Sequence, residues 1–433
     1  MQSIPPWTSL DAAAQQRWRT TLRDVAREAD RRFNAFTSIE PAVDEPPHGA
    51  LAGLPYAVKD MFRIAGHVPT CGLSDGSGLT IAGESDLLRR LDEAGADRVG
   101  FTNMTELAYE PSGYNASRGR IKNPWNTDFI AGGSSSGSAV AVAVGAAAAA
   151  LGSDTAGSLR IPAHACGVTA LKPTNGLVSM QGVMPLSPSL DTIGFLARDA
   201  ADLILVTSAC LSLPARRPIA RAVVLADAME QSEPAVQAAC SDAIDAIGTC
   251  GIAIALRRGL QIFEAMDPHI FVILQAEAAR EHRAALNDER LSASLRKRLA
   301  KGTQISDDTR ENALSKRLQA DGSFNEQVFG EADIVMLPVM PICTPEAALC
   351  DPTSARFSPK TLYELSRFTR FANFLGLPAA AMPAGFDDRG MPVALQIVGR
   401  PGQELALLEL VRTVQARSEW HARMPTALAQ DRP

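Results

Sequence analysis

The amino-acid sequence predicts a protein of the α/β class, in which strands and helices alternate along the chain. Short apolar runs with the length of buried strands occur at 51–61, 97–101, 334–339 and 393–398. Longer segments in which apolar residues recur at helical spacing lie between them. With 433 residues, the chain is long enough for one large hydrophobic core.

The clearest helical pattern lies at 8–36, where one apolar stripe faces a charged surface. Thr8 with Asp11 predicts a capping box at the start of this helix. Residues 85–94 predict a second helix, which Gly95 ends.

The middle of the chain has a different character. Residues 110–133 are rich in Gly, Asn, Pro and Ser and predict a long irregular segment, which in a compact domain is usually functional. Residues 137–145 predict a helix of small residues. The run 146–152 fits either an extension of that helix or a buried strand, while 215–330 is charged and helical in character.

Composition excludes several classes of protein. The net charge is -6 and no basic cluster is present, so the chain is a poor candidate for binding nucleic acid or a membrane surface. The start of the chain lacks a basic stretch followed by an apolar run, and the seven cysteines form no C-x-x-C pair. These features predict a cytoplasmic protein with free thiols. The six histidines form no H-E-x-x-H pattern, so we expect no metal and no organic cofactor.

The densest chemical signal is Gly-Gly-Ser-Ser-Ser-Gly-Ser at 132–138, followed by Asp-Thr-Ala-Gly-Ser-Leu-Arg at 154–160. The first segment lacks the lysine of a phosphate-binding loop. It matches G-x-S-x-G with Ser135 in the centre, but the loop-like residues before it are unlike the strand that a nucleophile elbow needs. A flexible linker is a third interpretation, although a linker would not be expected to lead straight into an apolar helix.

Taken together, the motifs resemble those of the amidase signature family. Leu-Pro-Tyr-Ala-Val-Lys-Asp at 54–60 resembles the family's lysine strand, 132–138 its serine-glycine loop and 154–158 its nucleophile turn. Further matches, among them Leu-Asp-Thr-Ile-Gly at 190–194 and Asn-Phe-Leu-Gly-Leu-Pro at 373–378, extend the resemblance over about 50–400. Ala156 departs from the family pattern, which most often has glycine there.

The resemblance implies a large central mixed β-sheet flanked by helices, built as a single domain over 1–433. Within it we expect an N-terminal helical segment at 1–48 and the core motifs at 50–200. A variable helical region that shapes the substrate pocket is expected at 215–345, and a return to the core sheet at 346–425.

The resemblance also implies a mechanism. Lys59 is the expected general base, Ser134 the proton relay after a cis peptide bond from Gly133, and Ser158 the nucleophile. A buried lysine can serve as a base because desolvation lowers its pKa. The expected oxyanion hole consists of backbone N–H groups of Thr155, Ala156, Gly157 and Ser158. The expected supporting residues are Gly132, Gly133, Ser135, Asp154 and Arg160.

The expected activity is hydrolysis of a small-molecule carboxamide by an amidase, for which a homodimer is one candidate assembly. One alternative is the glutaminase (A) subunit of a tRNA-dependent amidotransferase, and another is an inactive scaffold protein. Four residues are expected to line the substrate pocket: Tyr109, Tyr114, Glu277 and Met340. Cys166 is expected to be a small buried residue and not a nucleophile.

Overall fold

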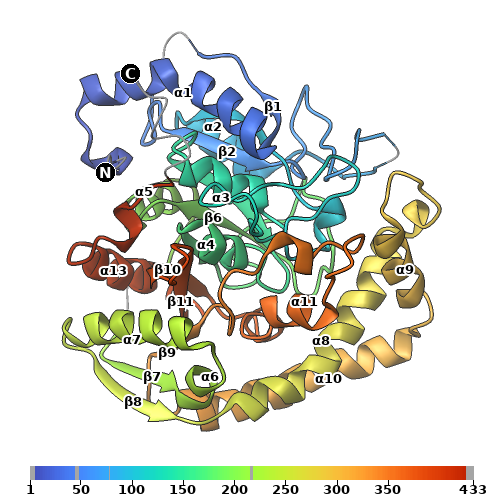
Figure 1. Ribbon diagram of the computed structural model, residues 1–433, viewed down its shortest axis with the longest axis vertical. Helices are drawn as coiled ribbons and strands as arrows, with labels where there is room; N and C mark the ends of the chain where they lie inside the picture. The colour runs from blue at the N-terminus through green and yellow to red at the C-terminus, as the bar shows by residue number, and fades with distance from the viewer. Residues whose placement is uncertain (1–4, 44–47, 78, 215–217, 426–433) are drawn as a thin grey trace.

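An eleven-stranded mixed sheet runs through the part of the chain that the structure describes (Figure 1). This structure is a computed structural model, and it describes residues 5–43, 48–77, 79–214 and 218–425. In sheet order the strands are β1 (Phe36–Ile39), β3 (Asp97–Thr102), β2 (Pro55–Lys59), β4 (Ala149–Asp154), β6 (Thr192–Ala197), β5 (Thr169–Lys172), β10 (Ala379–Phe386), β11 (Pro392–Gly399), β9 (Ile334–Pro338), β7 (Arg221–Leu225) and β8 (Ala253–Arg257). The sheet thus confirms the predicted α/β class and the mixed sheet.

Helices cover both faces of the sheet. One face packs against α2 (Asp86–Glu93), α5 (Ala200–Cys210), α7 (Pro234–Gly248) and α13 (Glu404–Gln415). The other face packs against α1 (Ala12–Phe33), α3 (Ser136–Ala143) and α4 (Arg160–Cys166), and further along against α8 (Leu260–Glu281) and α12 (Arg370–Phe374). The remaining helices are α6 (Ala226–Glu230), α9 (Ala293–Gly302), α10 (Asp307–Phe324) and α11 (Pro359–Leu365).

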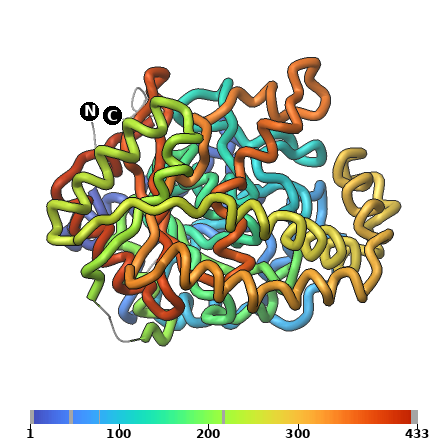
Figure 2. Tube along the Cα trace, turned by 90° about the horizontal axis from the view of Figure 1, so that it is seen from below, coloured from blue at the N-terminus to red at the C-terminus, as the bar shows by residue number. Residues whose placement is uncertain are grey.

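The helices α8, α9 and α10 form an arc outside the strands at the lower right of Figure 1. In the view from below, their yellow and orange trace crosses the near side of the molecule (Figure 2). The hydrophobic residues of α8 pack against α12 and against β7 and β9. The arc formed by α8, α9 and α10 therefore packs, through α8, against the half of the sheet that lies away from β2 and β4.

Three parallel strands position the site. Strand β2 lies between β3 and β4 and runs parallel to both, and all five of its residues are buried. Because parallel strands end at the same edge of a sheet, the carboxyl ends of β2 and β4 bring Lys59 and Ser153 together. The run 146–152, which periodicity left open, thus enters a buried strand at Ala149.

Two expectations about local structure are wrong. The first helix begins at Ala12, with Asp11 as its N-cap, because the Asp11 side chain accepts a hydrogen bond from the Ala14 N–H at 2.7 Å. Thr8 instead donates its N–H to Asp202. The region 215–330 is not purely helical, since β7 and β8 lie within it and extend the sheet. Residues 1–4, 44–47, 78, 215–217 and 426–433 of the expected segments lie outside the described residues.

Candidate active site

Lys59 is the centre of a buried cluster of hydroxyl groups at the carboxyl end of β2. Its side chain is fully buried, and Nζ lies 2.6 Å from Oγ of Ser134, 3.2 Å from Oγ of Ser135 and 2.8 Å from Oγ of Ser153. Ser134 and Ser135 come from the segment before α3, whereas Ser153 is part of β4. Three separate elements therefore meet at one amino group.

Burial decides the charge of this amino group. Removal from water lowers the pKa of Lys59 from 10.5 to about 7, although the carboxylates of Asp154 and Asp191 act in the opposite direction. A neutral amine has two N–H donors and one lone pair. Because the Ser135 hydroxyl donates to the Ser153 carbonyl oxygen at 3.1 Å, Ser135 must accept from Lys59. One N–H thus serves Ser135, which leaves one N–H and the lone pair for Ser134 and Ser153.

A lowered pKa does not by itself mark a base. Burial also lowers the pKa of Lys172 to about 7, but the ammonium of Lys172 donates to the carbonyl of Pro173 and to the side chain of Asn175. Neither partner is a hydroxyl that could give up a proton to a lysine. Lys59 differs from Lys172 because its partners are serines.

The segment before α3 makes a tight turn at Ser134, the expected proton relay. The Gly133–Ser134 peptide bond is cis, as the resemblance implies. A Cβ on Gly133 would lie 2.8 Å from the carbonyl oxygen of Glu110, so no larger residue fits at this position without movement. Ser136 fastens the start of the helix by donating to the carbonyl of Gly132 at 2.5 Å.

The turn that carries Ser158 is held by a buried ion pair. Arg160 contacts both carboxylate oxygens of Asp154 at 3.0–3.1 Å, and both side chains are fully buried. Burial alone would raise the pKa of Asp154, but Arg160 outweighs this effect and lowers the pKa to about 2. Arg160 also donates to the carbonyl of Thr369 and to the side chain of Asn373.

Asp154 also binds one of the four backbone N–H groups that were expected to form the oxyanion hole. The Gly157 N–H donates to Oδ1 of Asp154 at 2.7 Å, so it is not free to bind a ligand. The conformation of Gly157, with φ +126°, is one that favours glycine, and a Cβ there would lie 2.3 Å from Oγ1 of Thr369. We infer that Gly157 shapes the turn, which leaves the N–H groups of Thr155, Ala156 and Ser158 as the expected donors.

Asp191 fixes the other side of the same turn. Its Oδ1 accepts a hydrogen bond from the Thr155 hydroxyl at 2.6 Å, and its Oδ2 accepts from the N–H groups of Leu186 and Ser187. Asp191, which does not line the cavity, thus holds the Thr155 side chain in place.

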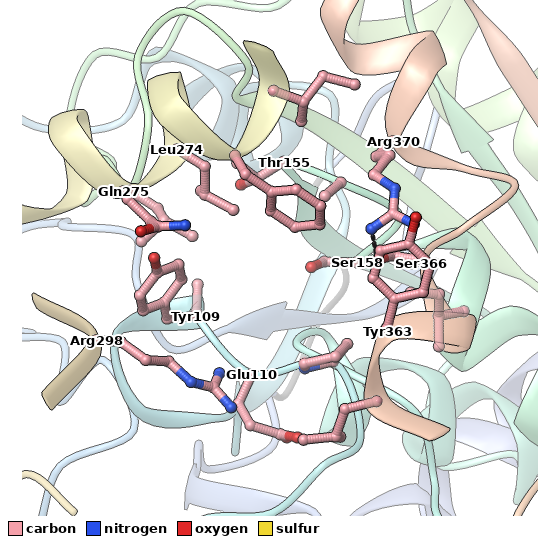
Figure 3. A pocket seen from close by; sticks show the side chains of 18 of the residues that line it. Tyr109, Glu110, Thr155, Ser158, Leu274, Gln275, Arg298, Tyr363, Ser366 and Arg370 are labelled. Atoms are coloured by element: carbon pink, nitrogen blue, oxygen red, sulfur yellow. Dashed lines mark hydrogen bonds between the residues drawn. The ribbon is translucent and has the colours of Figure 1, made fainter. Parts of the chain in front are cut away.

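A cavity of about 310 Å³ opens beside Ser158 (Figure 3). Figure 3 shows Tyr109, Gln275 and Arg298 on one side of it and Tyr363, Ser366 and Arg370 on the other. The wall also contains apolar side chains of α8, Ile270, Phe271 and Leu274. Lys59 and Ser134 are fully buried behind this wall, whereas Ser158 lies on its surface.

Glu110 supplies a carboxylate to the cavity. Its Oε2 accepts hydrogen bonds from the N–H groups of Ser112, Gly113 and Tyr114 at 2.8–3.1 Å. Its Oε1 is buried and has no hydrogen-bond partner among the described residues. Burial raises the pKa of this carboxyl group, although the backbone donors and Arg298 oppose the effect. The free oxygen is an acceptor for a donor group of a ligand.

The expected pocket residues are only partly found in the wall. Tyr109 lines the cavity, and Tyr114 lines a smaller pocket beside it. Glu277 does not line the cavity, because its carboxylate binds the hydroxyls of Ser187 and Ser189 and the guanidinium of Arg310. Met340 is fully buried in the hydrophobic core. The expectation for these two residues is therefore wrong.

Comparison with known proteins agrees with this geometry. The chain belongs to the amidase family, because the family model described as Amidase matches residues 12–408. A curated relative from Ralstonia nicotianae, the A subunit of its glutamyl-tRNA(Gln) amidotransferase, is 32% identical over 441 residues, which cover 88% of this chain and 87% of that protein. The protein is therefore an enzyme that acts on amide C–N bonds.

Two solved structures share the fold over nearly their whole length. A crystal structure of an amidase is 30% identical, with a TM-score of 0.82, and the match covers 94% of this chain and 99% of that one. A structure from work on the origins of an s-triazine catabolic enzyme is 29% identical, with a TM-score of 0.79, and covers 92% and 96%. Among the helices that the structure describes, none is long and apolar enough to cross a membrane.

Proposed function

We propose that this chain cleaves a carboxamide through an acyl-enzyme on Ser158, with Ser134 as the proton relay and Lys59 as the general base. The observation that carries the proposal is the 2.6 Å contact between Nζ of Lys59 and Oγ of Ser134, made by a lysine whose pKa burial lowers to about 7. A lysine that is largely neutral near pH 7 can accept a proton from a hydroxyl group.

The proton moves in two linked steps. Ser134 gives its hydroxyl proton to Nζ of Lys59 and takes the proton of Ser158, whose Oγ forms a bond to the carbonyl carbon of the substrate. The protons then return along the same path to the amide nitrogen, and the C–N bond breaks. Water next attacks the ester on Ser158 with the same base and releases the carboxylic acid.

The negative charge on the carbonyl oxygen needs donors in this mechanism. We assign that role to the backbone N–H groups of Thr155, Ala156 and Ser158. The Asp154–Arg160 pair and Asp191 support the assignment, because they hold the turn from both sides.

The similarities favour the glutaminase subunit over a free-standing amidase as the particular function. Eight curated relatives at 29–32% identity are A subunits of glutamyl-tRNA(Gln) amidotransferases. In that function this chain would release ammonia from glutamine within a complex, and partner proteins would bind the tRNA. The free-standing amidase remains the second candidate, because a solved amidase at 30% identity covers 94% of this chain.

One assay tests both levels of the proposal. The purified chain is given glutamine, and then a panel of amides and ureas, and ammonia is measured with and without the partner proteins of an amidotransferase. Glutamine hydrolysis that depends on the partners supports the amidotransferase function, whereas hydrolysis of another amide by the chain alone supports the free-standing enzyme.

The Ser158→Ala variant tests the nucleophile. We expect a loss of more than about 1,000-fold in kcat with an unchanged melting temperature, since only one small group is removed. Activity within tenfold of the wild type would exclude Ser158 from this role.

A further inference from the structure

Arg370, the first residue of α12, is the most deeply buried cation in the cavity wall. Its side chain is only 1% exposed, whereas Arg298 is half-buried and Lys301 is exposed. Both of the latter residues belong to α9 at the mouth of the cavity. A charge that is withdrawn from water needs compensation, so the partners of Arg370 are informative.

One edge of the guanidinium forms an ion pair with Asp267, although Nε makes no hydrogen bond. Nε lies 2.8 Å from Oδ1 of Asp267, whose Oδ2 accepts a hydrogen bond from the Tyr363 hydroxyl at 2.6 Å. The ring centres of Phe271 and Tyr363 lie 4.8 Å and 4.2 Å from the guanidinium carbon. These contacts hold the orientation of the side chain before any ligand binds.

The other edge has only one hydrogen-bond partner. Nη1 makes one long hydrogen bond of 3.4 Å to Oγ of Ser366, which also lines the cavity. Nη2 is buried and has no hydrogen-bond partner among the described residues. A buried donor without a partner destabilises the unliganded protein, and a group on a ligand can satisfy it.

We propose that this free edge of Arg370 binds a carboxylate of the substrate, so that the enzyme selects amides that carry a carboxylate a few bonds from the scissile carbonyl. The proposal rests on the proposed amide hydrolysis at Ser158. The planar fork of a guanidinium matches the two oxygens of a carboxylate, which a lysine cannot do. Glutamine and the monoamides of dicarboxylic acids belong to this class.

The position of Arg370 relative to the nucleophile supports the proposal. Figure 3 shows Ser158 and Arg370 in the wall of one cavity, which Ser366 also lines. The adjacent Thr369 donates its hydroxyl to the carbonyl of Ala156 at 2.6 Å, which ties the start of α12 to the nucleophile turn. A small substrate can therefore reach Ser158 and Arg370 at the same time.

Arg298 and Lys301 are less suited to this role. Lys301 is exposed, and Arg298 is half-buried with its guanidinium over the ring of Tyr109, so neither charge needs an anion as much as Arg370 does. We assign them the attraction of anions to the cavity mouth.

The kinetic test compares two amides of similar shape. Glutaric acid monoamide carries the carboxylate, and pentanamide lacks it. We expect the wild type to prefer the charged amide, and Arg370→Met to lower kcat/KM for it by about 30-fold or more, with a smaller effect on pentanamide. Arg370→Lys should restore part of the selectivity, and Arg356→Met, which removes an exposed cation outside the cavity, should leave it unchanged.

Loss of Arg370 leaves Asp267 buried without its cation, so the single variant could unfold. The double variant Arg370→Met with Asp267→Asn removes both charges and keeps the test valid. An unchanged ratio of kcat/KM for the two amides in a folded variant would overturn the proposal. Equal values of kcat/KM for pentanamide and for the charged amide in the wild type would also overturn the proposal.

A binding measurement separates this inference from the proposed function. Calorimetry with glutarate and Ser158→Ala needs no turnover, and we expect binding that Arg370→Met weakens by about 30-fold or more. If glutarate binds in this way but the wild type hydrolyses no amide, the proposed function fails and the Arg370 site stands. If amides are hydrolysed but Arg370→Met does not weaken glutarate binding, the Arg370 site fails and the proposed function stands.

Discussion

Nζ of Lys59 lies 2.8 Å from Oγ of Ser153, a residue of the neighbouring parallel strand β4. Ser153 thus provides a third hydroxyl contact to the lysine, in addition to those of the serine-glycine loop. An ammonium donates three hydrogen bonds and a neutral amine only two. Loss of the Ser153 acceptor therefore destabilises the protonated form of Lys59 more than the neutral form.

Ser153→Ala is therefore expected to lower the pKa of Lys59 further and to reduce kcat by about tenfold, since the amine loses part of its orientation. The pH profile of kcat measures both effects. Ser138→Ala is the matched control, because the Ser138 hydroxyl donates to the Leu151 carbonyl and does not contact Lys59. An inflection that moves to higher pH would contradict this account.

The pH dependence of the wild type follows from the state of Lys59. Burial lowers its pKa to about 7, so the proposed base is protonated below this pH and neutral above it. We expect kcat to rise as the pH increases through about 7 and then to level off. A profile that keeps rising towards 10.5 would show that Lys59 titrates like an exposed lysine.

Lys59 and Ser134 are expected to act as one unit. Each single alanine variant should lower kcat by several orders of magnitude, and the double variant should be little worse than the more damaging single one. A native thermal melt of Lys59→Ala is the control, because it distinguishes a lost base from an unfolded strand end. Fully additive losses would speak against a shared proton path.

The Asp154–Arg160 pair should dominate the local stability of the nucleophile turn. Asp154→Asn leaves a buried guanidinium without its anion and is expected to lower the free energy of unfolding by about 3 kcal/mol or more. Chemical denaturation measures this loss.

The same pair has a predictable dependence on acid. The pKa of Asp154 is lowered from 3.8 to about 2, so its stabilisation is present above about pH 4 and is lost as the pH falls towards 2. The difference in stability between the wild type and Asp154→Asn should shrink over this range. A constant difference would indicate that the charge of Asp154 does not matter.

Treatment with a strong chelator is expected to leave kcat unchanged. The proposed chemistry takes its nucleophile from Ser158 and its base from Lys59, and both are side chains of the chain itself. Activity that disappears with chelator and returns with zinc would overturn this mechanism.

The sequence points to the residues of the proposed chemistry more clearly than to those of the proposed specificity. Lys59, Ser134 and Ser158 lie in short motifs whose order along the chain is enough to relate them to a family. Ser153 and Arg370 have no such signal, because Ser153 lies in an apolar strand run and Arg370 in a segment without an obvious motif. Their roles depend on which strands are neighbours and which helix faces a cavity, and neither can be deduced from local spacing.

The same limit applies to the fold. The buried strands β2 and β3 were predicted, because their apolar residues and turn signals are local. Strand β8 was not predicted, although residues 252–256 form a short apolar run. It is an edge strand with no buried residue, and charged helical segments flank it along the chain. Glu277 and Met340 were wrongly placed in the cavity wall because burial and hydrogen-bond partners depend on tertiary packing.

The contact between the start of α12 and the nucleophile turn has an evolutionary consequence. Lys59, Ser134 and Ser158 lie within the single stretch 59–158, whereas Arg370 and much of the opposite wall come from α8, α9, α11 and α12. The two parts meet through Thr369, which contacts Ala156 and Arg160. The substrate can therefore change during evolution through replacement of α8, α9, α11 and α12 while Lys59, Ser134 and Ser158 stay the same. The replacement must keep a threonine at position 369, where the two parts meet.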